Sequence, residues 1–197
     1  LAVLATAASM LVGLAIGIAA GYCGGAVDAV ITCISNVFQG LPGTILMIAL
    51  VGVMERGAQS IILALVITSW VGFSRLVRGE VMKVKSEMYV EGMRCLGAGH
   101  LRIVLRHVLP NIRTNIIILF TTRVGRVVLS VAGLSYLGLG IQPPDPSWGS
   151  MLSEARTFME QAPWMAIFPA LFIIVTILLF NILGDSLRDV LDPKLKT

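Results

Sequence analysis

Long apolar segments separated by short polar ones dominate the pattern of this chain. The apolar segments cover about residues 1–22, 28–53, 60–77, 111–134 and 164–183. Each has roughly the 20 residues that a helix needs to cross a hydrocarbon layer about 30 Å thick. Because backbone polar groups find no water in lipid, every such segment is expected to be helical. The pattern predicts an all-α, polytopic membrane protein with five transmembrane helices in a single domain over residues 1–197.

A polar segment, residues 75–113, separates the third apolar segment from the fourth and carries eight Lys/Arg and three Glu. Inside it, four apolar residues fall at i, i+3, i+4 and i+7, namely Leu101, Val104, Leu105 and Val108. This spacing predicts a short helix with one apolar stripe and its polar face free. Two interpretations stay open, because such a helix either docks a soluble partner or rests on the lipid surface.

A second short helix is predicted just before the first, with the ion pairs Lys83–Glu87 and Glu91–Arg94. The glycines of Gly97-Ala-Gly99 end this helix and permit a reversal of the chain. Pro110 suits the first turn of the following span, where its missing N–H costs nothing. The polar segment is therefore expected to form a helix–turn–helix beneath the membrane.

Basic residues set the orientation, because cytoplasmic loops carry an excess of Lys and Arg. Placing residues 75–113 in the cytoplasm puts the tail after residue 184 there too and leaves the loop 135–163 outside. Eleven of the fifteen Lys/Arg then face the cytoplasm, namely the eight in the polar segment, Arg188, Lys194 and Lys196. Trp148 and Trp164 fall near the outer end, where amphipathic rings favour the interface.

The composition agrees with a lipid environment. Hydrophobic residues make up 56% of the chain and charged residues 13%, against about 25% in soluble domains. The net charge of +4 is explained by the cytoplasmic loops, and no nucleic-acid binding is predicted because no basic stretch is interleaved with aromatics. The three cysteines lack CxxC spacing, so no metal site is predicted. The chain begins at Leu1 with an apolar run, and we expect it to be a fragment.

Glycines and prolines inside the spans predict close packing and bends. Gly13, Gly17 and Gly21 repeat every four residues in the first segment. Such a face lets another helix approach closely, although glycines are also merely tolerated in membrane helices. Pro42 and Pro169 each remove a backbone donor within a span and are expected to bend it.

Arg123 and Arg126 lie well inside the fourth apolar segment, three residues apart on one helix face. An arginine at membrane depth costs about 2.5–3.5 kcal/mol on insertion scales, so neither should face lipid. Three interpretations stay open: the pair lines a translocation path that favours an anionic group, it meets an acid on a partner subunit, or it reaches to the interface. His100 and His107 lie in the polar segment and are expected to be surface or docking residues.

The polar segment resembles the coupling loop of ABC-importer permeases. Glu91, Gly97, Leu109 and Pro110 stand at the spacing of the family's EAA motif. Further stretches resemble the C-type permease subunit of the dipeptide/oligopeptide/nickel branch, namely Gly21-Tyr-Cys-Gly-Gly25, Arg75-Leu-Val-Arg78, Ala132-Gly-Leu-Ser-Tyr-Leu-Gly-Leu-Gly140 and Pro143-Pro-Asp-Pro-Ser-Trp-Gly149. The resemblance implies the type I ABC-importer permease fold, with residues 78–110 as cytoplasmic coupling helices.

The same resemblance implies a non-catalytic, multi-pass subunit of the cell inner membrane that imports small peptides or nickel and other metal chelates. Its implied partners are two cytoplasmic ATPase subunits, a second, different permease subunit, an external substrate-binding protein and the lipid bilayer. ATP and Mg would be bound by the ATPase subunits, and this chain would bind no cofactor. It has no GxxxxGK[ST] motif of its own.

The residue patterns and the resemblance together give the candidate site residues. The ATPase-coupling candidates are Glu91, Gly92, Arg94, Gly97, Arg102, Arg106, Leu109 and Pro110. The substrate-path candidates are Arg123, Arg126, Ser130 and Asn36, and the binding-protein contact candidates are Trp148, Glu154 and Arg156. Asn36 and Ser130 stand where the branch often has acidic residues, so the solute, peptide or metal chelate, stays open.

The alternative function is an ion- or proton-coupled secondary transporter or a channel. Such proteins usually place acidic residues in mid-span. All eleven acidic residues of this chain lie in predicted loops or near span ends. An intramembrane enzyme would need a nucleophile and a base, or metal ligands, at depth, and none is predicted here. The sequence therefore favours an importer permease driven by a separate ATPase.

Overall fold

The computed structural model describes residues 1–142 and 144–191, so Pro143, Lys194 and Lys196 lie outside the described residues. Within these ranges the regular elements are all helical. In chain order they are α1 (Ala2–Cys23), α2 (Gly25–Gly40), α3 (Gly43–Val53), α4 (Ala58–Lys85), α5 (Met88–Cys95), α6 (His100–Ile103), a π-helical turn (Val104–Val108), α7 (Leu109–Tyr136), α8 (Trp148–Ala155), a 3-10 turn (Arg156–Phe158) and α9 (Trp164–Leu191).

Four of the described helices are long and apolar enough to cross a membrane: α1, α4, the continuous helix His100–Tyr136, and α9. The bent pair α2 and α3 makes a fifth span if it is counted as one. This agrees with the five predicted segments, although α4 and α9 extend about two turns beyond the predicted ends at residues 77 and 183. Helices continue past the apolar segment because their backbone groups stay paired in water as well as in lipid.

The predicted bend at Pro42 is a break between two helices. α2 and α3 differ in direction by 86°, with only Leu41 and Pro42 between them. Leu41 is extended, with φ −99° and ψ 136°, as expected for a residue whose α conformation clashes with a following proline ring. In contrast, Pro169 lies inside the continuous helix α9.

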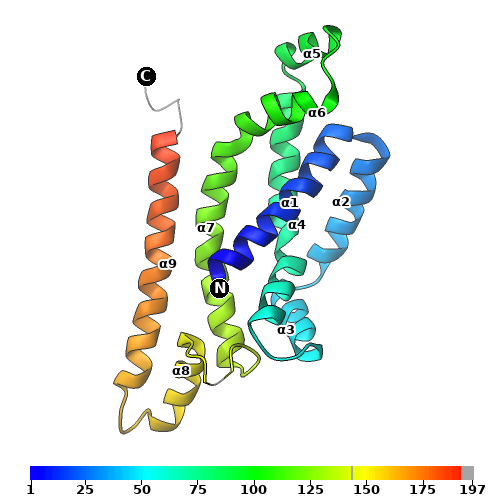
Figure 1. The fold of residues 1–197 in the computed structure, drawn as a ribbon. Helices are drawn as coiled ribbons and strands as arrows, with labels where there is room; N and C mark the ends of the chain where they lie inside the picture. Colours follow the sequence, from blue (N-terminus) through cyan, green and yellow to red (C-terminus); the bar gives the residue numbers. More distant parts are fainter. Residues whose placement is uncertain (143, 192–197) are drawn as a thin grey trace.

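The first and fourth helices pack closely through the glycine face of α1 (Figure 1). A Cβ at Gly13, Gly17 or Gly21 would lie 2.7, 2.6 or 2.8 Å from a backbone carbonyl oxygen of α4. The buried hydroxyl of Ser9 adds a hydrogen bond to the Leu65 carbonyl, at 3.3 Å. The prediction that these glycines admit a neighbouring helix is confirmed, and the neighbour is α4.

The short helix predicted around residues 101–108 is not separate from the following span. α6, the π-helical turn and α7 form one continuous helix from His100 to Tyr136. The π turn ends just before Pro110, whose ring would otherwise collide with the carbonyl four residues earlier. The extra residue in that turn places Ile103 and Val108, five apart, on the same buried face.

The predicted apolar stripe of this region is therefore wrong. It assumed a spacing of 3.6 residues per turn, which the π turn breaks. Val108 is buried as expected, whereas Leu101 and Leu105 are 71% and 55% exposed. The predicted ion pairs also differ, because Lys83 pairs with Glu80 at 3.0 Å and Arg94 lies over the ring of Tyr22.

The polar segment forms a protrusion at one end of the bundle (top in Figure 1), and α8 lies at the other end. α5 ends in a turn in which Ala98 N–H donates to Met93 O and Gly97 N–H to Arg94 O. This is the Schellman arrangement, and it needs the left-handed φ of +80° that Gly97 has. Gly24, with φ +69°, similarly permits α2 to follow α1 after a single residue.

The α1–α4 contact predicts a different outcome for two glycine-to-alanine changes. Gly17→Ala places a methyl group against the Ser74 carbonyl, whereas a Cβ at Gly79 on α4 meets nothing within 4 Å. We expect Gly17→Ala to cost about 1–3 kcal/mol through overpacking. Thermal unfolding in detergent should show a lower midpoint for Gly17→Ala and an unchanged midpoint for the control Gly79→Ala. Equal midpoints would contradict the packing described here.

Candidate functional site

The protrusion formed by α5, α6 and the π turn exposes large apolar side chains. Met88 and Leu96 are 86% and 84% exposed, and Leu101 and Leu105 also point away from the core. Six of the eight predicted coupling residues are exposed as well, namely Glu91, Gly92, Gly97, Arg102, Arg106 and Pro110. Leu109 and Pro110 lie where the π turn passes into α7. The protrusion thus combines apolar and cationic side chains on a surface that no other part of the described chain covers.

Tyr22, at the end of α1, joins this protrusion to the bundle. The guanidinium carbon of Arg94 on α5 lies 5.5 Å from the centre of the Tyr22 ring. The Tyr22 hydroxyl is hydrogen-bonded to Nδ1 of His100 on α6 at 3.0 Å. Lys85 Nζ donates to the Tyr22 carbonyl oxygen at 2.7 Å, so the end of α4 is attached as well. Tyr22 stands in a stretch quoted above, but sequence reasoning gave it no role, since no spacing along the chain relates it to residues more than sixty positions away.

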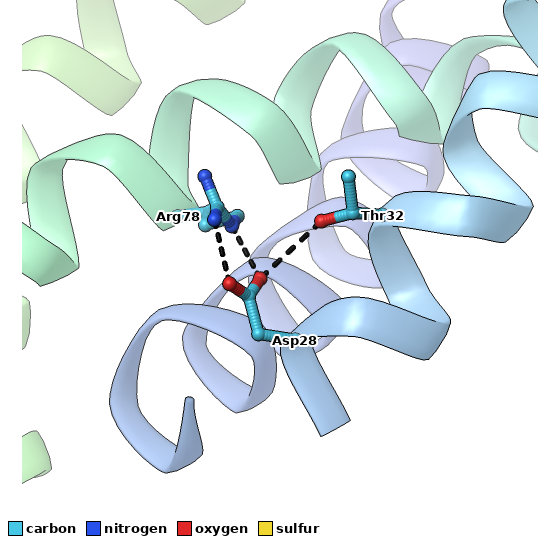
Figure 2. Close-up of polar contacts among 3 residues, drawn as sticks. All are labelled: Asp28, Thr32 and Arg78. Carbon is cyan, nitrogen blue, oxygen red and sulfur yellow. Dashed lines mark hydrogen bonds and ion pairs between the residues drawn. The ribbon is translucent and has the colours of Figure 1, made fainter. Parts of the chain in front are cut away.

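A charged pair connects α2 to α4 near the same end of the bundle (Figure 2). Arg78 donates from Nε to one carboxylate oxygen of Asp28 and from Nη2 to the other, the latter at 2.6 Å. Thr32 donates to Asp28 Oδ1 at 3.3 Å. Bidentate pairs of this kind are among the stronger hydrogen-bonded contacts, because both partners are charged and their planes match. Arg78 occurs in a motif quoted above, but the sequence did not pair it with Asp28.

Asn36 lies beside Arg75 rather than beside the arginines of α7. Arg75 Nη2 donates to Asn36 Oδ1 at 2.6 Å. Both line a pocket of about 300 Å³ between α2 and α4, together with Ile31, Thr32, Ser35, Ser74 and Arg78. The structure therefore separates Asn36 from the other three substrate-path candidates, which all belong to α7.

The two arginines of α7 occupy different environments. Arg123 is partly buried against α4, with its guanidinium carbon 6.0 Å from the centre of the Phe73 ring. The absence of a side chain at Gly72 makes room for it, because a Cβ there would lie 2.5 Å from Arg123 Nη2. Arg126 is exposed. Neither has an acidic partner within the described part of the chain.

Ser130 follows Arg126 by one turn and donates to its carbonyl oxygen at 3.1 Å. It also lines an apolar pocket of about 380 Å³ between α3 and α7. The expectation that Arg123 and Arg126 share one face is only partly met, since one is held inside the chain and the other projects from it. Sequence spacing predicted where Arg123 and Arg126 lie along the helix, but not that Arg123 packs against α4.

The binding-protein contact candidates gather at α8, on the end of the bundle opposite the protrusion (Figure 1). Glu154 and Arg156 are exposed, and the Arg156 guanidinium lies 5.7 Å from the centre of the Tyr136 ring. Trp148 is stacked on Phe172 of α9, with ring centres 6.0 Å apart. Ser147 caps α8 by accepting a hydrogen bond from Ser150 N–H at 3.1 Å. Trp148 therefore fixes α8 to α9 with much of its surface.

No group of three or more His, Cys, Asp or Glu residues that could hold a metal ion occurs in residues 1–142 and 144–191. His100 is engaged by Tyr22, and the ring of His107 lies 6.2 Å from that of Tyr89. The polar side chains of the protrusion and of the α8 end can bind other proteins. None of the described arrangements pairs a nucleophile with a base.

Comparison with curated proteins finds relatives over most of the chain. The "Glutathione transport system permease protein GsiD" of Pectobacterium atrosepticum is 46% identical over 188 residues, which are 95% of this chain and 62% of the relative. The protein of the same name from Shigella flexneri serotype 5b is 48% identical over 169 residues, covering 86% of this chain and 56% of the relative. The chain thus spans about three fifths of the length of the curated relatives it matches.

A solved structure has the same fold. The methionine ABC transporter MetNI, in a structure described as inward facing, aligns over 97% of this chain and 93% of its own with a TM-score of 0.71 and 18% identity. The family described as "Binding-protein-dependent transport system inner membrane component" matches residues 13–197. With its several apolar helices, the chain is a multi-pass protein of the inner membrane. It belongs to the family of inner-membrane permease components of binding-protein-dependent ABC transport systems.

Proposed function

We propose that this chain is the membrane-spanning subunit of an ATP-driven importer of small peptides. The observation that carries the proposal is the protrusion of α5, α6 and the π turn, whose exposed apolar residues suit a groove on another protein. Membership of the permease family supports the same function. The relatives are named for glutathione, a tripeptide, which favours a peptide over a nickel chelate as the solute. A secondary transporter or channel is not favoured.

The protrusion can transmit force to the bundle by two routes. α6 is continuous with α7, so a displacement of the docked surface moves a span directly. α5 is attached to α1 through Arg94 and Tyr22, and α1 packs closely on α4. In the proposed mechanism two cytoplasmic ATPase subunits bind ATP and Mg, and their closure displaces the protrusion. The chain itself performs no chemistry and binds no cofactor.

The opposite end of the bundle is the proposed contact for the external substrate-binding protein. Glu154 and Arg156 offer exposed charges there, and α8 is attached to α9 by the stacking of Trp148 on Phe172. A polar surface attached to a spanning helix suits a partner that must dock repeatedly and deliver solute. This assignment rests on family membership and on the position of α8 at the end away from the protrusion.

Arg126 is proposed to face a second, different permease subunit. It is exposed on a spanning helix, and an arginine facing lipid would be costly, so protein or water must cover it. An acid on the second subunit would neutralise it. Arg123 has a different role, because it is already held against Phe73 within its own chain and stabilises the contact of α7 with α4.

A pair of glycine changes tests the coupling role of the protrusion. A Cβ at Gly97 or Gly99 meets nothing within 4 Å, but φ is +80° at Gly97 and −65° at Gly99. Gly97→Ala should therefore strain the turn by about 1–2 kcal/mol, whereas Gly99→Ala should not. In the reconstituted complex we expect Gly97→Ala to lower uptake and binding-protein-stimulated ATPase activity several-fold. Identical behaviour of the two variants would count against this role.

A second test addresses docking itself. Leu101→Glu combined with Leu105→Glu puts charge on exposed apolar positions of the protrusion. We expect the ATPase subunits to be lost when the permease is purified from membranes. The control is Val53→Glu at the end of α3, an apolar residue that is 91% exposed at the opposite end of the bundle. Retention of the ATPase by the double variant would refute the docking surface.

The two arginines of α7 should respond differently to neutral replacement. Arg126→Gln removes the charge proposed to meet the second permease subunit and should weaken co-purification of the two permeases. Arg123→Gln loses only a cation–π contact of about 0.5–1 kcal/mol and should lower the thermal midpoint while the subunits stay together. If Arg126→Gln leaves assembly intact but reduces uptake of anionic solutes more than neutral ones, the residue lines the path instead.

A further inference from the structure

A pocket between α2 and α4 is lined by polar and charged side chains and is open to the surface at Asn36 and Arg75. Its volume of about 300 Å³ lies at the lower end of the range typical of small-molecule sites. Two hydroxyl residues that line it, Ser35 and Ser74, are each 2% exposed, so their positions are fixed by packing. Hydroxyl groups both donate and accept hydrogen bonds, and a solute in this pocket would meet them at close range.

The charges around the pocket leave one cation without a counter-charge. Of its two arginines, Arg78 is neutralised by the bidentate pair with Asp28. Arg75 has no acidic partner among the described residues. Arg75 is exposed on α4, two residues before the apolar segment predicted from the sequence ends at residue 77, so its charge is open to a solute or to another protein. The pocket therefore carries one positive charge that a ligand can neutralise.

Asn36 holds this free arginine in place. Its side-chain oxygen accepts a hydrogen bond from one terminal nitrogen of Arg75 at 2.6 Å. A guanidinium group has five N–H donors, so one bond of this kind orients the side chain and leaves most of its donors available. The planar fork of an arginine matches a carboxylate, with which it forms two parallel hydrogen bonds.

Arg75 lies far enough from the end of α4 to belong to a solute site rather than to the contacts that the last residues of this helix make. Arg75 precedes the last residue of α4, Lys85, by ten positions, which is about 15 Å along the helix. The Asp28–Arg78 pair lies one turn closer to that end and adds no net charge. Arg123, the alternative cation, is already packed against Gly72 and Phe73 and lines neither the α2–α4 pocket nor the α3–α7 pocket.

We propose that Arg75, oriented by Asn36, binds a carboxylate of the transported solute in the pocket between α2 and α4. The assignment rests on the proposed importer function and deepens it, because it specifies anionic small peptides as the solute class. One interpretation of the sequence was that Arg123 and Arg126 favour an anionic group. The proposal gives this role to Arg75, a residue that sequence reasoning did not select. An acidic side chain of the second permease subunit is the competing occupant, and the experiment below separates the two.

The test measures uptake of glutathione and of its diethyl ester by the complete transporter in liposomes, with the binding protein and ATP. The ester blocks both carboxylates and keeps the remainder of the tripeptide. Each rate is divided by that of the unaltered complex with the same solute, so that selectivity of the binding protein cancels. We expect Arg75→Gln to lower glutathione uptake about tenfold, the size of one lost charged contact of about 1.4 kcal/mol, and to leave ester uptake nearly unchanged.

Two further variants show whether geometry matters as well as charge. Arg75→Lys keeps the charge but loses the fork, so it should recover part of the preference for glutathione. Asn36→Ala should lower glutathione uptake less than Arg75→Gln does. The control Arg188→Gln removes an exposed arginine of α9 and should leave the uptake of both solutes unchanged. Basal ATPase activity and the thermal midpoint are recorded for every variant.

The outcomes separate failure of this inference from failure of the proposed function. An unaltered complex that imports neither solute in the presence of ATP would overturn the peptide-importer function itself. Import by the unaltered complex together with an equal loss of both solutes in Arg75→Gln would overturn the carboxylate site and indicate an ion pair with the second subunit. Import of both solutes by Arg75→Gln at unaltered rates would also overturn it.

Discussion

The close contact of α1 with α4 is the constraint on which the other features depend. Three glycines on one face of α1 bring its backbone against the carbonyl groups of α4, with no side chain between them. This approach places the end of α1 beside the end of α4, so that Lys85 reaches the Tyr22 carbonyl. It also fixes where α2 begins, because a single glycine separates α2 from α1. The Asp28–Arg78 pair and the polar pocket follow from that placement.

The sequence predicted the class of the protein well because lipid imposes simple rules. Apolar length located the spans, and the basic segment located the protrusion. The glycine repeat predicted a close helix neighbour, though not that the neighbour is α4. These features depend on composition over many residues or on strict spacing, and tertiary structure alters neither.

The sequence-based predictions were wrong where one local change of the backbone alters which residues share a helix face. The π turn before Pro110 adds a residue to one helical turn, which moved Leu101 and Leu105 to the surface. Contacts between distant segments were equally out of reach. Tyr22 with His100, and Arg75 with Asn36, join residues on separate helices whose relative rotation no periodicity determines. Arg123 lies in a spanning helix as predicted, but its neighbour Phe73 could be found only from the packing of two helices.

The break between α2 and α3 determines which side of the chain can touch hydrocarbon. The last carbonyl groups of α2 have lost their partners, because the helix stops at Gly40 and turns by 86°. Unpaired backbone at membrane depth is tolerated only where protein or a water-filled cavity covers it. Where α2 and α3 together form one span, the break lies within the bilayer, and the α2 side of the chain must then face protein or a water-filled cavity rather than hydrocarbon.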